Sequence, residues 1–300
     1  MKIYLANDTS SFHAGSAAVM ASIRHTLVQQ GHEIIGSSPR PGGCDVELIK
    51  RCDAMVLNGE GAIQEETRGM DNFRSERLML GLILAKAHGA KAYLVNAVWS
   101  QMRPVWHDVL QMLDGVWVRE LSSAEEMQLH QHFEPMICPD LSYSCPLDES
   151  APRRDFQGKA VVGVLYPRNM PKWRKFSHTS WPFHRMPVLG LGGIAEPGHP
   201  PSANWSSVVG SLRTAELYVT GQHHGVLAAC KARIPFAVMK LHNHKIEGLF
   251  RWAGVRIPIA HTRFELIRAI RFARENSDEF KKLFDFLDKC PQWPGIPITD

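Results

Sequence analysis

The sequence of 300 residues has little of what several classes of protein need. Its six cysteines are scattered and form no CxxC pair, which favours reduced thiols over a disulfide framework. No apolar run approaches the ~20 residues of a membrane-spanning helix, and no secretory segment precedes the first expected strand. We therefore expect a cytoplasmic protein, with any membrane contact peripheral and at the inner membrane.

An excess of charge of one sign is also missing. The formal net charge is +4 and the pI is near 8.7, which is too mildly basic to predict nucleic acid as the partner. Anionic small molecules and anionic lipid surfaces are compatible with this charge. The motifs GxxxxGK[ST] and GxSxG are absent as well, so a kinase or a hydrolase is disfavoured.

The chain does contain a regular alternation of short apolar runs with helical stretches, which predicts βαβ units and parallel sheets. Its length exceeds the usual ~100–200 residues per domain, and the polar segment 146–158 (PLDESAPRRDFQG) is typical of a linker. We therefore predict the α/β class, with two Rossmann-like domains over residues 1–148 and 159–300 that face each other across a ligand-binding cleft. Strands are expected over residues 2–7, 32–38, 53–58, 91–99, 115–120, 159–167, 186–193, 215–221 and 234–240, and helices over 15–30, 46–51, 74–88, 105–113, 204–211, 225–231, 245–253 and 264–274.

Ligands of open α/β sheets bind at the carboxyl ends of the strands, so the polar residues that follow strands are the candidates. NDTSSFHAG (residues 7–15) follows the first strand, and its hydroxyls and the helix behind it could hold an anion or a sugar hydroxyl. Asn7, Asp8 and Ser10 are the expected contacts, and His13 is the most chemically useful member. The alternative is a loop whose Asp8, Thr9 and Ser10 only cap and turn the backbone.

NGEG (residues 58–61) follows the third strand. Its glycines let the backbone turn sharply and present the Glu60 carboxylate at a strand tip, where packing gives no reason for a charge. We predict Glu60 as a general base or as a ligand for a sugar hydroxyl, with Asn58 beside it.

Arg119 stands at the end of the fifth expected strand. Its planar guanidinium suits recognition of a carboxylate or phosphate. Alternatively, it pairs with Glu120 or another carboxylate while Ser122 or Ser123 caps the next helix. Asp140 in PDLSY lies either at the interdomain edge or in a structural turn.

TGQHHG (residues 220–225) stands where a strand is expected to turn into a helix. The backbone amides there would point at a ligand with the positive end of the helix behind them. Two imidazoles can bind an anion, protonate a leaving phosphate or accept a proton from an attacking hydroxyl. We predict that His224 is the main contact, although either ring could instead cap the helix. The remaining ligand-binding candidates are Gly221, Gln222, His223 and Gly225.

Two further segments carry charge or imidazole. In LHNHKIEG (residues 241–248), Lys245 and Glu247 are predicted near a phosphate or ribose, unless they only begin an exposed helix. The HxH pattern suits a metal, but no third ligand follows by spacing, so no metal is expected. The segment 167–187 is basic and aromatic and includes Arg168. It could rest on anionic lipid, embrace a glycan or lipid-linked acceptor, or form a packed irregular loop.

Taken together, these motifs resemble the polysaccharide pyruvyl transferase family. The resemblance is carried by NGEG, by Arg119 with Ser122 or Ser123, by Pro139 and Asp140, and by TGQHHG followed about 20 residues later by HKIEG. It runs from the first strand through Gly254. It implies two domains like those of the GT-B glycosyltransferases, with residues 1–148 on the acceptor side and 159–300 on the donor side.

The resemblance also implies a reaction and roles. A pyruvyl group would pass from phosphoenolpyruvate to hydroxyls of a glycan or lipid-linked saccharide in exopolysaccharide or lipopolysaccharide assembly, with no bound cofactor. His224 would protonate or hold the leaving phosphate, and Glu60 or His13 would activate the acceptor hydroxyl. The implied donor-binding residues are Gln222, His223, Gly221, Gly225, Arg119, Arg168, Lys245 and Glu247, and the implied acceptor-binding residues are Asn7, Asp8, Ser10 and Asn58.

One position departs from the family pattern. The family usually has arginine after the first glycine of the TG segment, and this chain has Gln222. A charge-assisted hydrogen bond is roughly twice as strong as a neutral one, so the identity of the donor stays open. One alternative is a GT-B-like glycosyltransferase that uses a nucleotide-activated sugar, for example a CMP-linked acidic sugar. The other is a non-catalytic glycan-binding relative.

Overall fold

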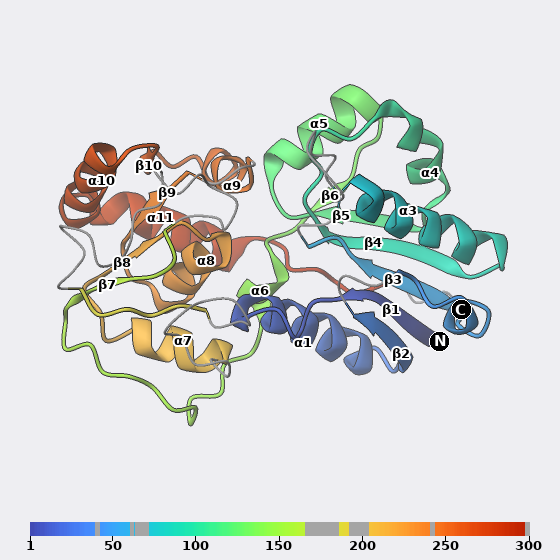
Figure 1. Cartoon of the computed structure of the whole chain (residues 1–300), viewed down its shortest axis with the longest axis horizontal. Coiled ribbons are helices and arrows are strands. Elements are labelled where there is room, and N and C mark those ends of the chain that lie inside the picture. The colour runs from blue at the N-terminus through green and yellow to red at the C-terminus, as the bar shows by residue number, and fades with distance from the viewer. Residues whose placement is uncertain are drawn as a thin grey trace. The chain divides into compact units, whose positions relative to one another are not determined.

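A computed structural model describes residues 1–39, 43–60, 63, 72–165, 186–191, 204–240 and 244–297 (Figure 1). The chain divides into two compact units. Unit 1 comprises Met1–Ser11, Val19–Cys145 and Pro291–Asp300, and unit 2 comprises Phe12–Ala18 and Pro146–Cys290. In the described part of the chain, every helix is too short or too polar to cross a bilayer.

Unit 1 is built on a six-stranded parallel sheet with the strand order β2-β1-β3-β4-β5-β6. Figure 1 shows α3, α4 and α5 on one face of this sheet and α1 on the other. The elements are β1 (Lys2–Asp8), α1 (Ala14–Gln29), β2 (Glu33–Pro39), α2 (Val46–Ile49), β3 (Ala54–Asn58), α3 (Asn72–Ala87), β4 (Lys91–Ala97), the 3₁₀ helix η1 (Pro104–Trp106), α4 (His107–Met112), β5 (Gly115–Val118), α5 (Leu121–Gln131), β6 (Met136–Ile137) and α6 (Leu141–Ser144).

The central strands β1, β3, β4 and β5 are buried along nearly their whole length because both faces of the sheet are covered. Successive side chains point to opposite faces. In β1, Tyr4 and Ala6 therefore lie in the core that includes residues of α3, whereas Ile3 and Leu5 lie in the core that includes residues of α1.

The last residues of the chain belong to unit 1, although the sequence placed them with the second domain. Trp293 packs against Trp117 with ring centroids 6.1 Å apart, and the Gln30 side-chain amide donates to the carbonyl oxygens of Pro294 and Ile296 at 3.1 Å each. At the other end of the chain, Phe12–Ala18 belongs to unit 2. Local sequence patterns cannot predict that these two segments pack in the other unit, because the contacts join residues far apart in the chain.

Unit 2 is built on a four-stranded parallel sheet with the strand order β10-β9-β8-β7. Beside β7, Val188 forms a parallel bridge to Val162. The elements are β7 (Ala160–Val162), α7 (Trp205–Leu212), β8 (Leu217–Thr220), α8 (His223–Ala232), β9 (Phe236–Met239), α9 (Lys245–Ala253), β10 (Ile259–Ala260), α10 (Arg263–Glu275) and α11 (Ser277–Lys289).

Several predicted elements of unit 2 are corrected. A strand was expected over 159–167, but among the described residues of that range only β7 is a strand. A second strand was expected over 186–193, but its described residues form only the bridge at Val188. The Tyr218 hydroxyl donates to the carbonyl oxygen of Leu189 at 2.8 Å, so a side chain from β8 occupies a backbone acceptor of this segment. The strand β10 and the helix α11 were not predicted.

Each sheet has a topological switch point. In unit 1, β1 lies between β2 and β3, and in unit 2, β7 lies between the Val188 bridge and β8. Open α/β sheets bind ligands at the carboxyl ends of the strands beside such a point. NGEG follows β3 and TGQHHG follows β8, so the two motifs occupy equivalent places within their own units.

Candidate functional site

A closed ring of hydrogen bonds lies at the switch point of unit 1. The Glu60 backbone N–H donates to Asn58 Oδ1 (3.1 Å), Asn58 Nδ2 donates to Thr9 Oγ1 (3.1 Å), and the Thr9 hydroxyl donates to Glu60 Oε2 (2.6 Å). Glu60 is 4% exposed and Thr9 is fully buried. The ring holds a buried carboxylate in one orientation at a strand tip, as a general base or a hydroxyl ligand requires.

The chain can form this ring because of two backbone features. A Cβ atom at residue 59 would lie 2.6 Å from Ala97 Cα of β4, so only glycine fits there. Asn7 adopts a left-handed φ of 58°, and its Nδ2 donates to the carbonyl oxygen of Asn58 at 2.6 Å. The side chains of Asn7 and Asn58 are buried within this network, where they link the ends of β1 and β3. Gly61 lies outside the described residues.

Asp8 also has partners within the protein. Its carboxylate accepts hydrogen bonds from Arg24 Nη2 (2.7 Å), Ser37 Oγ (3.0 Å) and the Ser10 backbone N–H (2.9 Å). Burial alone would raise the pKa of Asp8, but the hydrogen bonds from Ser10, Arg24 and Ser37 outweigh it and the pKa falls below its usual value. The Asp8 carboxylate is thus held by Arg24 and Ser37 as well as by the turn at Ser10, and Ser10 is exposed.

Arg119 follows β5 and is buried in unit 1. Its guanidinium pairs with the Asp140 carboxylate, and each side chain is 1% exposed. Asp140 also accepts from the Ser142 backbone N–H (2.9 Å) and hydroxyl (2.6 Å) at the start of α6. Within the part of the chain that the structure describes, Arg119 Nε makes no hydrogen bond. Asp140 thus holds the guanidinium in place.

The residue after Arg119 starts the next helix. The Glu120 carboxylate accepts from the backbone N–H groups of Ser122 (2.7 Å) and Ser123 (3.0 Å), so Glu120 is the N-cap of α5. The alternatives in which Glu120 pairs with Arg119, or Ser122 or Ser123 caps the helix, are therefore wrong. The pairing residue is Asp140.

In unit 2, TGQHHG is the turn from β8 to α8. The helix begins at His223 with Gln222 as its N-cap, two residues before the predicted start at Gly225. His223 is 4% and His224 6% exposed. A Cβ atom at residue 221 would lie 2.6 Å from the carbonyl oxygen of Leu165, so glycine lets the turn fold tightly against the chain that leaves β7.

The first turn of α1 packs against this histidine pair within unit 2. The rings of His13 and His224 meet edge to face with centroids 5.0 Å apart. A Cβ atom at residue 15 would lie 2.5 Å from His224 Cβ, so Gly15 permits the close approach. The Ser16 backbone N–H donates to His13 Nδ1 at 3.2 Å, so His13 caps α1. The sequence predicted both histidines but assigned them to different domains, and it missed Gly15.

The remaining predicted residues lie near the carboxyl end of β9 or are not among the residues that the structure describes. Lys245 begins α9, and the Glu247 carboxylate forms an ion pair with Lys240, which follows β9. Because β9 lies next to β8 in the sheet, this group adjoins the strand that ends in TGQHHG. Arg168, His242 and residues 167–185 of the basic aromatic segment lie outside the described residues.

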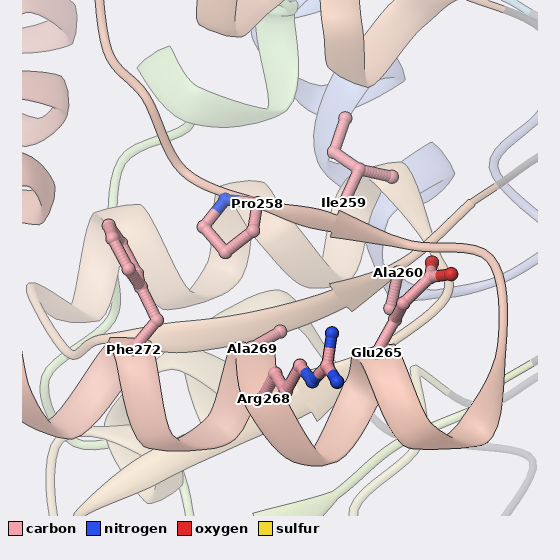
Figure 2. Close-up of a pocket in the computed structure, with 7 residues that line it drawn as sticks. All are labelled: Pro258, Ile259, Ala260, Glu265, Arg268, Ala269 and Phe272. Carbon is pink, nitrogen blue, oxygen red and sulfur yellow. The ribbon is translucent and has the colours of Figure 1, made fainter.

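Two pockets in the described part of the chain contain no residue predicted from the sequence. One, of about 290 Å³, lies between α10 and the segment of β10, and Figure 2 shows Glu265, Arg268 and Phe272 rising from the helix toward residues 258–260. The other, of about 300 Å³, lies in unit 1 and is lined by Gln101, Met102, Pro104, Glu126 and His130. In the first, the Glu265 carboxylate is engaged by the His261 backbone N–H at 2.7 Å. We assign neither pocket as the site.

Comparison with solved structures shows the fold. MnaA from S. aureus, solved with UDP, has a TM-score of 0.59 at 11% identity over 95% of this chain and 90% of that chain. UDP-GlcNAc 2-epimerase from Neisseria meningitidis, solved with UDP-GlcNAc, has 0.57 at 9% over 94% of each chain. The spinosyn rhamnosyltransferase SpnG has 0.54 at 10% over 97% of each chain. The predicted class is confirmed: the fold is the GT-B type, with two Rossmann-like domains.

Comparison at the sequence level shows the family. No protein with a curated description matches the sequence. The family model of polysaccharide pyruvyl transferases matches residues 13–243, which run from His13 past the TGQHHG turn. The predicted resemblance is thereby confirmed, and the chain is a transferase that belongs to the polysaccharide pyruvyl transferase family.

Proposed function

We propose that this transferase moves a pyruvyl group from phosphoenolpyruvate onto two hydroxyls of a sugar in a cytoplasmic step of surface-glycan assembly. The observation that carries the proposal is the contact between His13 and His224 at the start of α8, inside the segment that matches the family. Two imidazoles at a helix N-terminus suit a phosphorylated donor, because the helix end favours negative charge and imidazole can protonate a leaving group.

The chemistry requires both a base and an acid. When a sugar diol and phosphoenolpyruvate form a ketal, two C–O bonds form at C2 of the donor and its bond to the phosphate oxygen breaks. One hydroxyl proton ends on C3, which becomes a methyl group, and the other leaves with inorganic phosphate. Glu60, oriented by its ring of hydrogen bonds, is proposed to take a hydroxyl proton, and His224 to supply the proton of the phosphate.

The proposed donor contacts lie mainly in unit 2. Gly221, Gln222, His223 and Gly225 present the turn and the N-terminus of α8, where backbone N–H groups favour an anion. Arg119 is proposed to bind a donor anion while Asp140 holds the guanidinium in place. The acceptor is proposed to be a glycan or lipid-linked saccharide. Contact of residues 167–187 with a membrane stays a prediction.

Donor binding and product formation test the proposal. A ligand at 100 times its Kd adds about 2.7 kcal/mol of stability. Because 1 kcal/mol raises the Tm of a large domain by about 2–4 °C, this corresponds to a rise of about 5–10 °C. We expect this rise with phosphoenolpyruvate and not with CMP, UDP or GDP. With a sugar acceptor, phosphate release and the new methyl signal of a pyruvate ketal in the proton NMR spectrum are expected.

The second candidate is a glycosyltransferase that uses a nucleotide-activated sugar. It is favoured by Gln222, which cannot provide the positive charge of the family's usual arginine, and by the fold shared with a rhamnosyltransferase. A thermal shift with one nucleotide, and none with phosphoenolpyruvate, would replace the first proposal by this one. Glycan binding without turnover under any donor would instead identify a non-catalytic relative.

Gln222→Arg is expected to lower the KM for phosphoenolpyruvate about tenfold. A hydrogen bond to a charged group is worth about 1.5–3 kcal/mol against about 0.5–1.5 for a neutral bond, and 1.4 kcal/mol corresponds to a factor of ten. The matched control is Gln128→Arg, which makes the same charge change at an exposed position of α5. If the KM is the same in both variants and the wild type, residue 222 does not bind the donor's anionic groups.

A further inference from the structure

Thr9 is fully buried directly after β1, and nothing in the sequence marked it as more than a turn residue. In the structure its hydroxyl connects two members of the hydrogen-bond ring, because it accepts from Asn58 Nδ2 and donates to Glu60 Oε2. We propose that Thr9 is a positioning residue that fixes the orientation of the Glu60 carboxylate and keeps it ionised. The inference rests on the proposed role of Glu60 as the base.

The direction of each hydrogen bond in the ring follows from its neighbour. The Glu60 backbone N–H can only donate, so the Asn58 atom it contacts at 3.1 Å is the amide oxygen. The Asn58 amide nitrogen therefore faces Thr9 and donates to its hydroxyl oxygen. The Thr9 hydroxyl hydrogen is thus directed to Glu60 Oε2, at a separation of 2.6 Å that is typical of a bond to an ionised carboxylate.

The ring is also anchored against rotation. Asn7 Nδ2 donates to the carbonyl oxygen of Asn58 at 2.6 Å and so joins the ends of β1 and β3. Threonine is branched at Cβ and has few accessible rotamers, so its hydroxyl stays where the ring needs it. A hydrogen bond donated to a carboxylate favours its charged form, which is the form that accepts a proton. Every contact used here lies within unit 1.

The test replaces Thr9 by valine, which keeps the shape and removes the hydroxyl. We expect kcat to fall about tenfold with the KM for the donor unchanged, and the acid limb of the pH–rate profile to move to higher pH. Thr9→Ser keeps the hydroxyl and is expected to restore both. The control is Thr26→Val, on the half-buried face of α1. If valine disturbs the fold, as judged by Tm, Thr9→Ala removes the same hydroxyl without its branch.

A measurement without substrate separates this inference from the proposed function. Titration of the Glu60 carboxyl carbon by ¹³C NMR is expected to show a higher midpoint in Thr9→Val than in the wild type, whatever the donor is. Glu60→Gln, which assigns the signal, also reports turnover. If Glu60→Gln has wild-type turnover, the proposed role of Glu60 as the base is refuted, but the inference about Thr9 is not. An unchanged midpoint in Thr9→Val would overturn the inference about Thr9, even with Glu60→Gln inactive.

Discussion

His224→Ala is expected to lower kcat for phosphate release by about 10²–10⁴-fold, the usual contribution of a positioned acid or base. The ring of His224 is buried at the first turn of α8 and meets the ring of His13. Steady-state release of inorganic phosphate measures the change in kcat.

Two controls separate lost chemistry from lost structure. His130→Ala removes an exposed imidazole from α5 and is expected to have wild-type kcat. Added imidazole is expected to restore part of the activity of His224→Ala, because the substitution leaves space beside Gly15 that the ring filled. A kcat for His224→Ala within threefold of the wild-type value would contradict the role proposed for His224.

Arg119→Met is expected to lower the free energy of unfolding by about 3–5 kcal/mol, the usual cost of removing one partner of a buried ion pair. Both side chains of the Arg119–Asp140 pair are 1% exposed, so the substitution leaves a carboxylate in the core without its cation. Methionine keeps most of the volume of the side chain, which limits the contribution of an empty cavity. Urea unfolding followed by tryptophan fluorescence measures the change.

The double variant Arg119→Met/Asp140→Asn identifies the cause. Asparagine removes the charge but keeps a side-chain oxygen that can accept the hydrogen bond from the Ser142 backbone N–H at the start of α6. We therefore expect the double variant to be more stable than Arg119→Met alone. If it is less stable, packing of the Arg119 side chain rather than the unpaired charge of Asp140 determines the effect.

Part of what the sequence left unpredicted was present as a pattern. Phe280, Leu283, Phe284 and Leu287 recur at helical spacing and form the buried face of α11, so this helix was predictable. The strand β10 has only two residues, too few for any periodicity to indicate. Glu120 is a less common cap than serine, which explains why the neighbouring serines were preferred as candidates.

The hydrogen-bond ring around Glu60 was only partly predictable from the sequence. Asn58, Gly59 and Glu60 are adjacent in sequence, and their place after a buried strand predicts a functional carboxylate exposed at the strand tip, whereas the structure buries it. That Thr9 closes the ring depends on β1 and β3 lying side by side, which is a property of the sheet order. In the same way, Asp140 meets Arg119 because the chain returns beside β5 through β6.

The sequence by itself determined the α/β class, the polar strand ends and the family, because periodicity and short motifs are local and survive without knowledge of contacts. The tertiary structure alone decided which of these residues meet. In it, the ring of His13 contacts the ring of His224, and Trp293 packs in unit 1. Asp8 forms an ion pair with Arg24, and Arg119 forms one with Asp140. These pairings join residues distant in the chain, and burial of charged and apolar side chains on folding selects them.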